Sequence, residues 1–182
     1  EADVEGVVAA IQKLAADSVA AHADAGEAHA AQAAAWKLRG RFERLREDGE
    51  PDGELWEKAS DASKRAAELL ADDKSEHMAN AIDALVEAAP PGDGARTGYL
   101  EKAQTLADEA LTACSSKDPI RLSMAGVVVA RVDDLMGRKK KGPAKKLAIP
   151  ALDMLEPLTK KSGDIQKGAI RRFNRLVRSV RD

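Results

Sequence analysis

The chain has 182 residues, of which 44% are hydrophobic but only 3% aromatic, a length sufficient for one sizeable core. No run of about 18 uninterrupted apolar residues is present to span a membrane. The single cysteine, Cys114, cannot form an internal disulfide, so nothing indicates an oxidising compartment and we expect an intracellular location, cytoplasmic or nuclear.

The net charge of −2 conceals two halves of opposite sign. Residues 1–100 hold 11 Lys and Arg against 21 Asp and Glu, a net charge of −10, whereas residues 101–182 hold 18 against 10, a net charge of +8. Such asymmetry indicates an anionic partner for the basic half, or pairing of the two halves within or between chains.

Alanine-rich sequence with few aromatic residues and many Glu, Lys and Arg is typical of helices. We therefore predict an all-α fold, a multi-helix bundle of six to eight helices. In it an acidic N-terminal half, residues 1–89, packs on a basic C-terminal half, residues 95–182. The Pro/Gly loop at 90–94 joins the halves into one compact domain. Because the chain begins with Glu1 and not methionine, we expect a processed product or an excised domain.

The first predicted helical segment extends from Asp3 to about Asp48, as one long helix or as two nearly collinear helices that break near Gly26. His22 and His29 share a face of it, but without further nearby ligands they are better interpreted as solvated or packing histidines than as a metal site. The apolar stripe of its first part is expected at Val4, Val7, Val8, Ile11, Leu14 and Val19.

A turn at 47–53 ends that segment, since EDGEPDG contains two glycines and a proline. Helices at 54–71 and 75–89 follow, with Asp52 and Ser75 as candidate N-caps. The acidic half is thus predicted to be helical up to the 90–94 loop.

The most apolar stretch of the chain is 118–137, and it is preceded by a predicted helix at 97–115. Asp118 is a candidate N-cap, Pro119 suits the first turn, and Gly137 can adopt the left-handed conformation that ends a helix. Apolar residues cover more than half of its circumference, so this helix should lie inside the bundle. A strand at 126–130 is the alternative, since that run is rich in β-branched residues, but no partner strand is apparent.

The segment GRKKKGPAKK at 137–146 is predicted to be a solvated basic loop that runs into a helix at about Pro143 or Pro150. Pro150 and Pro157 are expected to limit this helix to short pieces or to bend it. Residues 162–164 then cap a last helix, Ile165 to Arg181. Advancing by about 100° per residue, its apolar residues occupy an arc of about 140° and its basic residues the remaining arc. This is a basic amphipathic helix with one face for packing and one for an anionic group.

The candidate site comprises the basic loop and this helix face. Guanidinium groups suit carboxylate and phosphate, and the scarcity of aromatic residues would favour contact with a nucleic-acid backbone over base reading. The candidate residues for binding a partner or nucleic acid are Arg138, Lys139, Lys140, Lys141, Lys145, Lys146, Lys167, Arg171, Arg172, Arg175, Arg178 and Arg181.

Catalytic patterns are missing from the sequence. Cys114 has no neighbouring histidine, and there is no Gly-x-Ser-x-Gly, metal-ligand spacing or glycine-rich cofactor loop. We therefore expect no enzyme, no cofactor, no metal and no small-molecule site. The first hypothesis is a non-catalytic helical interaction module, or a subunit of a larger assembly, that docks a protein partner or self-associates. The alternative is a helical subunit that binds a nucleic-acid backbone.

Overall fold

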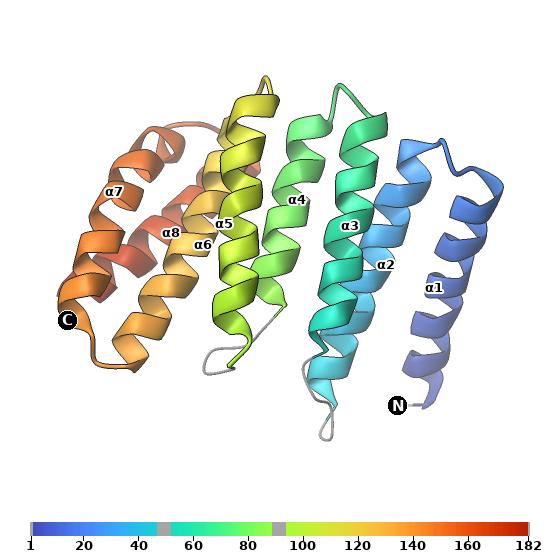
Figure 1. The fold of residues 1–182 in the computed structure, drawn as a ribbon, viewed down its shortest axis with the longest axis horizontal. Coiled ribbons are helices and arrows are strands. Elements are labelled where there is room, and N and C mark those ends of the chain that lie inside the picture. Colours follow the sequence, from blue (N-terminus) through green and yellow to red (C-terminus); the bar gives the residue numbers. More distant parts are fainter. Residues whose placement is uncertain (1, 47–51, 89–93, 182) are drawn as a thin grey trace. The chain divides into compact units, whose positions relative to one another are not determined.

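A computed structural model describes residues 2–46, 52–88 and 94–181 of the protein (Figure 1). Within these ranges every regular element is an α-helix, so the all-α prediction is confirmed and the strand at 126–130 is wrong. The eight helices of the described ranges are α1 Ala2–Ala21, α2 Gly26–Leu45, α3 Gly53–Leu69, α4 Lys74–Glu87, α5 Arg96–Ala113, α6 Asp118–Gly137, α7 Lys141–Thr159 and α8 Gly163–Arg181.

The chain divides into two compact units, residues 1–89 and 90–182. Unit 1 carries 10 Lys and Arg against 20 Asp and Glu, a net charge of −10, and unit 2 carries 19 against 11, a net charge of +8. Of the predicted connecting segments, residues 47–51 and 90–93 lie outside the described residues. The packing of the acidic half on the basic half stays a prediction.

In unit 1 each helix packs against the next along the chain (Figure 1). Residues 22–25 form a turn between α1 and α2, in which the amide of Ala25 donates to the carbonyl of His22 at 3.0 Å. Glu5, early in α1, lies 3.4 Å from Arg46, just beyond the end of α2. The two helices are therefore antiparallel neighbours, so the two-helix alternative is confirmed and the collinear arrangement is wrong.

The centre of unit 1 is built from small residues around one large ring. Trp56 of α3 is buried and lies against Gly40 of α2, where an added Cβ would approach the indole to 2.7 Å. Helices α2 and α4 are joined by Lys37, which donates to Asn80 at 3.1 Å, and burial lowers the pKa of Lys37. The predicted cap at Asp52 is confirmed, since its carboxylate accepts the amide of Glu54 at 2.9 Å. The remaining core is largely alanine, which lets these helices approach closely.

Helix α1 does not follow the predicted orientation of its apolar residues. Among residues 4–21 of α1, Val8 and Ala15 are the two that are buried, and they lie against α2. Four of the six residues expected to face inward are exposed: Val4 by 54%, Val7 by 54%, Ile11 by 38% and Leu14 by 70%. The cause is that α1 is apolar over a wide arc but packs against a neighbour on one side of it.

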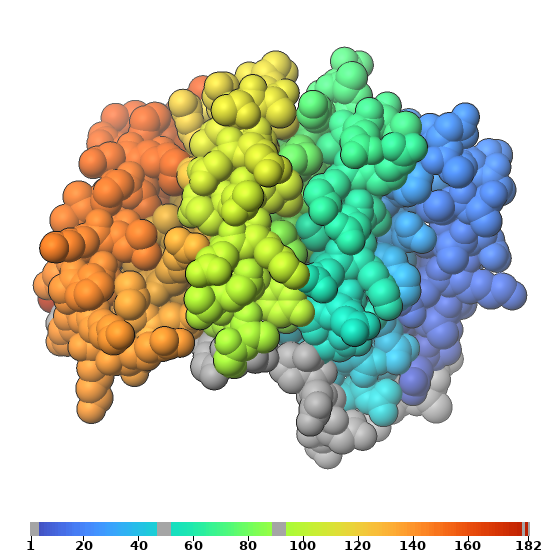
Figure 2. Space-filling view, in the orientation of Figure 1, coloured from blue at the N-terminus to red at the C-terminus, as the bar shows by residue number. Residues whose placement is uncertain are grey.

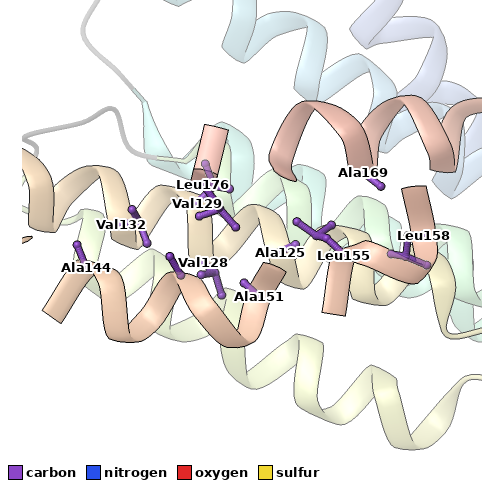
Figure 3. Close-up of a cluster of buried hydrophobic side chains, with 11 residues drawn as sticks. Ala125, Val128, Val129, Val132, Ala144, Ala151, Leu155, Leu158, Ala169 and Leu176 are labelled. Carbon is purple, nitrogen blue, oxygen red and sulfur yellow. The ribbon is translucent and has the colours of Figure 1, made fainter. Parts of the chain in front are cut away.

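Unit 2 is organised around α6, which packs against α5, α7 and α8. Figure 3 shows side chains of α6, α7 and α8 converging on one core. Ser123 and Gly126 are buried with the valines, so small residues allow close contact on several sides. The core residues are Ala125, Val128, Val129, Val132, Ala144, Ala148, Ala151, Leu155, Leu158, Ala169 and Leu176.

The bounds of α6 agree with the prediction, but its ends are stabilised differently. Asp118 is the first helical residue and not the N-cap, and its carboxylate lies 3.1 Å from the ammonium group of Lys161. Gly137 stays helical, and the left-handed conformation falls on Lys139, with φ of 58°. Ser75 likewise lies inside α4 and is buried rather than capping it.

Helix α7 corrects two predictions. The segment 138–146 is not one loop, because α7 begins at Lys141, close to the predicted start at about Pro143, and only Arg138, Lys139 and Lys140 connect it to α6. Pro143 fits in the first turn, where amide hydrogens have no intrahelical acceptor. The helix also continues through Pro150 and Pro157 instead of breaking into short pieces. Both prolines are exposed, so water can bond the carbonyls that they leave without an amide partner.

Candidate nucleic-acid and partner interfaces

The directions of three helices bring many of the predicted cations together. Helices α6, α7 and α8 are joined by short connections and pack on one another, so α8 runs in the direction of α6. The guanidinium of Arg175 in α8 lies 2.6 Å from the carboxylate of Asp133 in α6. This ion pair sets the axial register of the two helices. The last turn of α8 is therefore level with the connection between α6 and α7, and Figure 1 shows the C-terminus beside that connection.

We call this cluster the basic end of unit 2. Among the described residues, no ion pair joins Lys139, Lys140, Arg178 or Arg181 to an acidic side chain, and all four are exposed. Lys167 lies at the start of α8, away from the cluster, and pairs with Asp164. The basic end consists of Arg138, Lys139, Lys140, Lys141, Lys145, Lys146, Arg178 and Arg181.

Three arginines of α8 stand outside the basic end. Arg171 is exposed in the middle of the helix. Arg172 is half-buried, and its Nε lies where a Cβ at position 126 would be only 3.2 Å away, so its guanidinium covers Gly126. Arg175 pairs with Asp133. The basic face of α8 is thus only partly available to a partner.

The apolar face of α8 is also rotated from the predicted arc. Ala169 and Leu176 are fully buried, whereas Ile170, at one edge of that arc, is 42% exposed. Gly168 and Arg172 occupy the opposite edge of the packing face, close to α6. Packing therefore centres on the small residues of α8, because these permit the close approach of α6.

One buried cation was not predicted. Arg96, at the start of α5, is buried with its Nε 2.9 Å from the Asp134 carboxylate, and its terminal nitrogen donates to the carbonyl of Ala130 at 3.4 Å. It fastens α5 to α6 and so belongs to the interior of unit 2. Nothing in the local sequence signals this role, because its partners lie more than 30 residues away.

A groove of about 280 Å³ lies in unit 2 where α5, α6 and α7 meet. Figure 2 shows the surfaces of α5 (yellow-green) and α7 (orange) with part of α6 between them. Three leucines, Leu100, Leu135 and Leu147, line it together with residues of both charge signs. The polar lining consists of Thr97, Glu101, Arg131, Asp134 and Arg138. This groove was not predicted, since its walls come from three separate segments.

The exposed residues of α1 form a second candidate interface, the α1 stripe, defined as Val4, Val7, Ile11 and Leu14. Their spacings of three, four and three residues place them in one row along the helix. This spacing is that of a coiled-coil seam. At about 100° per residue, the stripe lies directly beside Val8 and Ala15, the residues of α1 that are buried against α2.

Cysteine and histidine are the residue types of this chain best suited to metal binding or nucleophilic chemistry. Cys114 is buried directly after α5, and the His29 ring nitrogen lies 2.9 Å from the carbonyl oxygen of Ala23. In residues 2–46, 52–88 and 94–181, no three His, Cys, Asp or Glu residues are grouped as a metal ion requires. None of the helices in these ranges combines the length and the apolar character needed to cross a bilayer.

Comparisons with protein-family models, with curated protein sequences and with solved structures found no match. The candidate sites of this all-α protein are the α1 stripe, the basic end and the groove.

Proposed function

We propose that the protein is a non-catalytic helical interaction module, or a subunit of a larger assembly, that docks a protein partner through the α1 stripe. The observation that carries this proposal is the exposure of four large apolar side chains in one row. An intracellular location, cytoplasmic or nuclear, is part of the proposal, and the free thiol of Cys114 supports it.

The physical reason is the free energy of removing apolar surface from water. Four side chains exposed to this degree present roughly 300–400 Å² of contiguous apolar surface, comparable to the largest patch on a typical monomer, which is often functional. At about 25 cal/mol per Å², covering it is favourable by several kcal/mol before the entropic cost of association. A helix packed along the stripe would cover all four residues at once.

Capture from cell extract, quantified by mass spectrometry, tests this proposal. We expect a protein bound near one-to-one by the tagged chain, retained at high salt and lost when Val7→Glu and Leu14→Glu are combined. Both positions are more than half exposed, so neither glutamate disturbs the core. Leu45→Glu is the matched control, since Leu45 is 84% exposed on α2 and lies outside the stripe. Recovery of the same proteins with the double variant would contradict the proposal.

The second candidate function is binding of a nucleic-acid backbone, and the basic end is the observation that favours it. Lys139, Lys140, Arg178 and Arg181 are exposed, form no ion pair among the described residues, and come from two segments that the fold brings to one end of unit 2. Such a cluster can contact several phosphates at once. Cations here also complement the negative C-terminal ends of α6 and α8, which is the simpler explanation of their placement.

Fluorescence anisotropy with a labelled single-stranded RNA tests the second candidate. We expect binding that weakens steeply between about 50 and about 200 mM salt. Combining Lys139→Glu, Arg178→Glu and Arg181→Glu should lower the slope of log K against log salt by about 2.

The matched control changes the same charge at the opposite ends of α6, α7 and α8, through Lys117→Glu, Lys160→Glu and Lys167→Glu. Equal loss of RNA affinity in the two triple variants would rule out a site at the basic end.

A further inference from the structure

We propose that the groove where α5, α6 and α7 meet binds a small amphipathic monocarboxylate, with one carboxylate head and an unbranched apolar tail, of the size of octanoate. The sequence led to the expectation of no small-molecule site, but a site whose walls come from three separate segments leaves no local motif to recognise. The groove belongs to unit 2 and the α1 stripe to unit 1, so this inference does not depend on the proposed docking function.

The part of the lining that comes from α6 forms a single row along that helix. Arg131, Asp134, Leu135 and Arg138 all line the groove, and their spacings of three, one and three residues place them on one face. Seven residues separate the two arginines, so the row is about 10 Å long. The groove therefore has an Arg131 end and an Arg138 end.

The Arg131 end carries charges of both signs. The guanidinium of Arg131 donates to the carbonyl of Leu100 at 3.4 Å, so the residue that follows Leu100, Glu101, lies at the same end of the groove. Glu101 is exposed, and its carboxylate would repel the carboxylate of a ligand. The charges at this end thus offset one another, and an anionic head group is not attracted here.

The Arg138 end carries a positive charge that no neighbouring carboxylate balances. Asp134, one turn earlier in α6, has its carboxylate 2.9 Å from Nε of the buried Arg96, so its own charge is already compensated. Arg138 is exposed and forms no ion pair among the described residues. Thr97, the residue after Arg96, adds a hydroxyl group to this lining. Because a planar guanidinium can donate two parallel hydrogen bonds to one carboxylate, the head group should bind at Arg138.

The apolar lining accepts the tail. It consists of one leucine from each helix, of which Leu100 is buried while Leu135 and Leu147 are half-buried. A cavity of about 150 Å³ holds benzene, so a groove of about 280 Å³ suits about eleven non-hydrogen atoms. An eight-carbon carboxylate is of this size, and its extended length is close to the distance from one arginine end to the other.

Nuclear magnetic resonance of the isotope-labelled full chain, titrated with sodium octanoate, tests the site. We expect saturable one-to-one changes in the amide shifts of the lining residues, with a dissociation constant on the order of 10–300 µM. Octanol, which has the same tail and no charge, should bind at least about tenfold more weakly. No saturable change up to about 3 mM octanoate, or changes centred on other residues such as the α1 stripe, would overturn the inference.

Two adjacent cations provide a matched pair of variants for the head group. Arg138→Gln should weaken octanoate binding at least about tenfold and alter octanol binding less than about twofold. Lys139→Gln removes the same charge from the next residue, which does not line the groove, and should alter octanoate binding less than about twofold. Both side chains are exposed, so neither change disturbs the core. Equal weakening by the two variants would indicate a diffuse attraction to the basic end and would refute the site.

Octanedioate, which carries a carboxylate at each end, tests the direction of the ligand. Its second carboxylate would meet Glu101, so the native chain should bind it at least about tenfold more weakly than octanoate. Glu101→Gln should narrow that ratio at least about threefold while leaving octanoate binding within about twofold. A ratio that Glu101→Gln leaves unchanged would contradict the placement of the head group at Arg138 and the tail toward Arg131.

Discussion

At the scale of single residues, Asp133 shows how two opposing effects combine in one ion pair. Burial raises the pKa of the Asp133 carboxyl above its ordinary value of 3.8, and the guanidinium of Arg175, 2.6 Å away, offsets only part of this. Desolvation therefore outweighs the attraction between the charges. The pair fixes the position of α8 on α6 more than it stabilises the fold.

This balance predicts a pH dependence of stability. A carboxyl whose pKa is raised by folding contributes stability that is present below about 3.8 and is lost as the pH rises through the folded-state pKa. The unfolding free energy of the native chain relative to Asp133→Asn should therefore fall as the pH rises from about 4 to about 7. Urea unfolding of both proteins across this range measures it.

Arg175→Gln provides the companion measurement. Removing the guanidinium takes away the offsetting charge, so the same fall with pH should become steeper. A relative stability that instead rises with pH would show that the ion pair outweighs burial at Asp133.

At the scale of helices, the sequence predicted the extents of α6 and α8 well, because turn residues and a proline mark where these helices begin and end. It was less successful at α1, since a periodic stripe indicates which residues share a face but not whether a neighbour covers that face. Charge density suggested a loop at 138–146, yet lysines are good helix formers and Pro143 suits a first turn.

For the candidate site, the sequence predicted which cations lie close together within one segment, but not which segments meet. The sequence shows that Arg178 and Arg181 share a basic face, and also that Lys139 and Lys140 are adjacent. It cannot show that the two groups meet, because that depends on helix directions. Nor can it show that Arg175 has a partner 42 residues earlier in the chain, at Asp133.

Helix α7 allows a test of the cost of an internal proline. Pro150 leaves the carbonyl of Lys146 without its helical amide, and both residues are exposed. Pro150→Ala should raise the unfolding free energy by about 1–3 kcal/mol, reduced somewhat by the greater freedom of the unfolded chain. Pro119→Ala in the first turn of α6 is the control and should not stabilise. Chemical denaturation monitored by circular dichroism decides between these outcomes.

At the scale of the whole molecule, the chain consists of two compact units, each with its own buried residues. Leu155 is fully buried in unit 2 and Ile82 is fully buried in unit 1. The two net charges, −10 and +8, belong to these same units. Net charge is therefore a property of each unit, and we expect the same of stability.

A destabilising substitution in the core of one unit should increase local unfolding in that unit and leave the other unit unaffected. Leu155→Ala should cost about 2–5 kcal/mol and accelerate amide hydrogen exchange in α6, α7 and α8, while α2, α3 and α4 keep their protection. Ile82→Ala should give the reverse pattern. Hydrogen exchange read by mass spectrometry measures both, and loss of protection throughout the chain in either variant would show that the two units unfold together.

The left-handed backbone at Lys139 has a consequence for any laboratory evolution of this protein. A non-glycine residue with φ of 58° bears roughly 1 kcal/mol of conformational energy that glycine would not. Screens for heat resistance should thus favour Lys139→Gly and so remove one positive charge from the connection. On the second candidate function, binding of a nucleic-acid backbone, the same change would weaken binding, so selection for stability and selection for binding would oppose each other at this position.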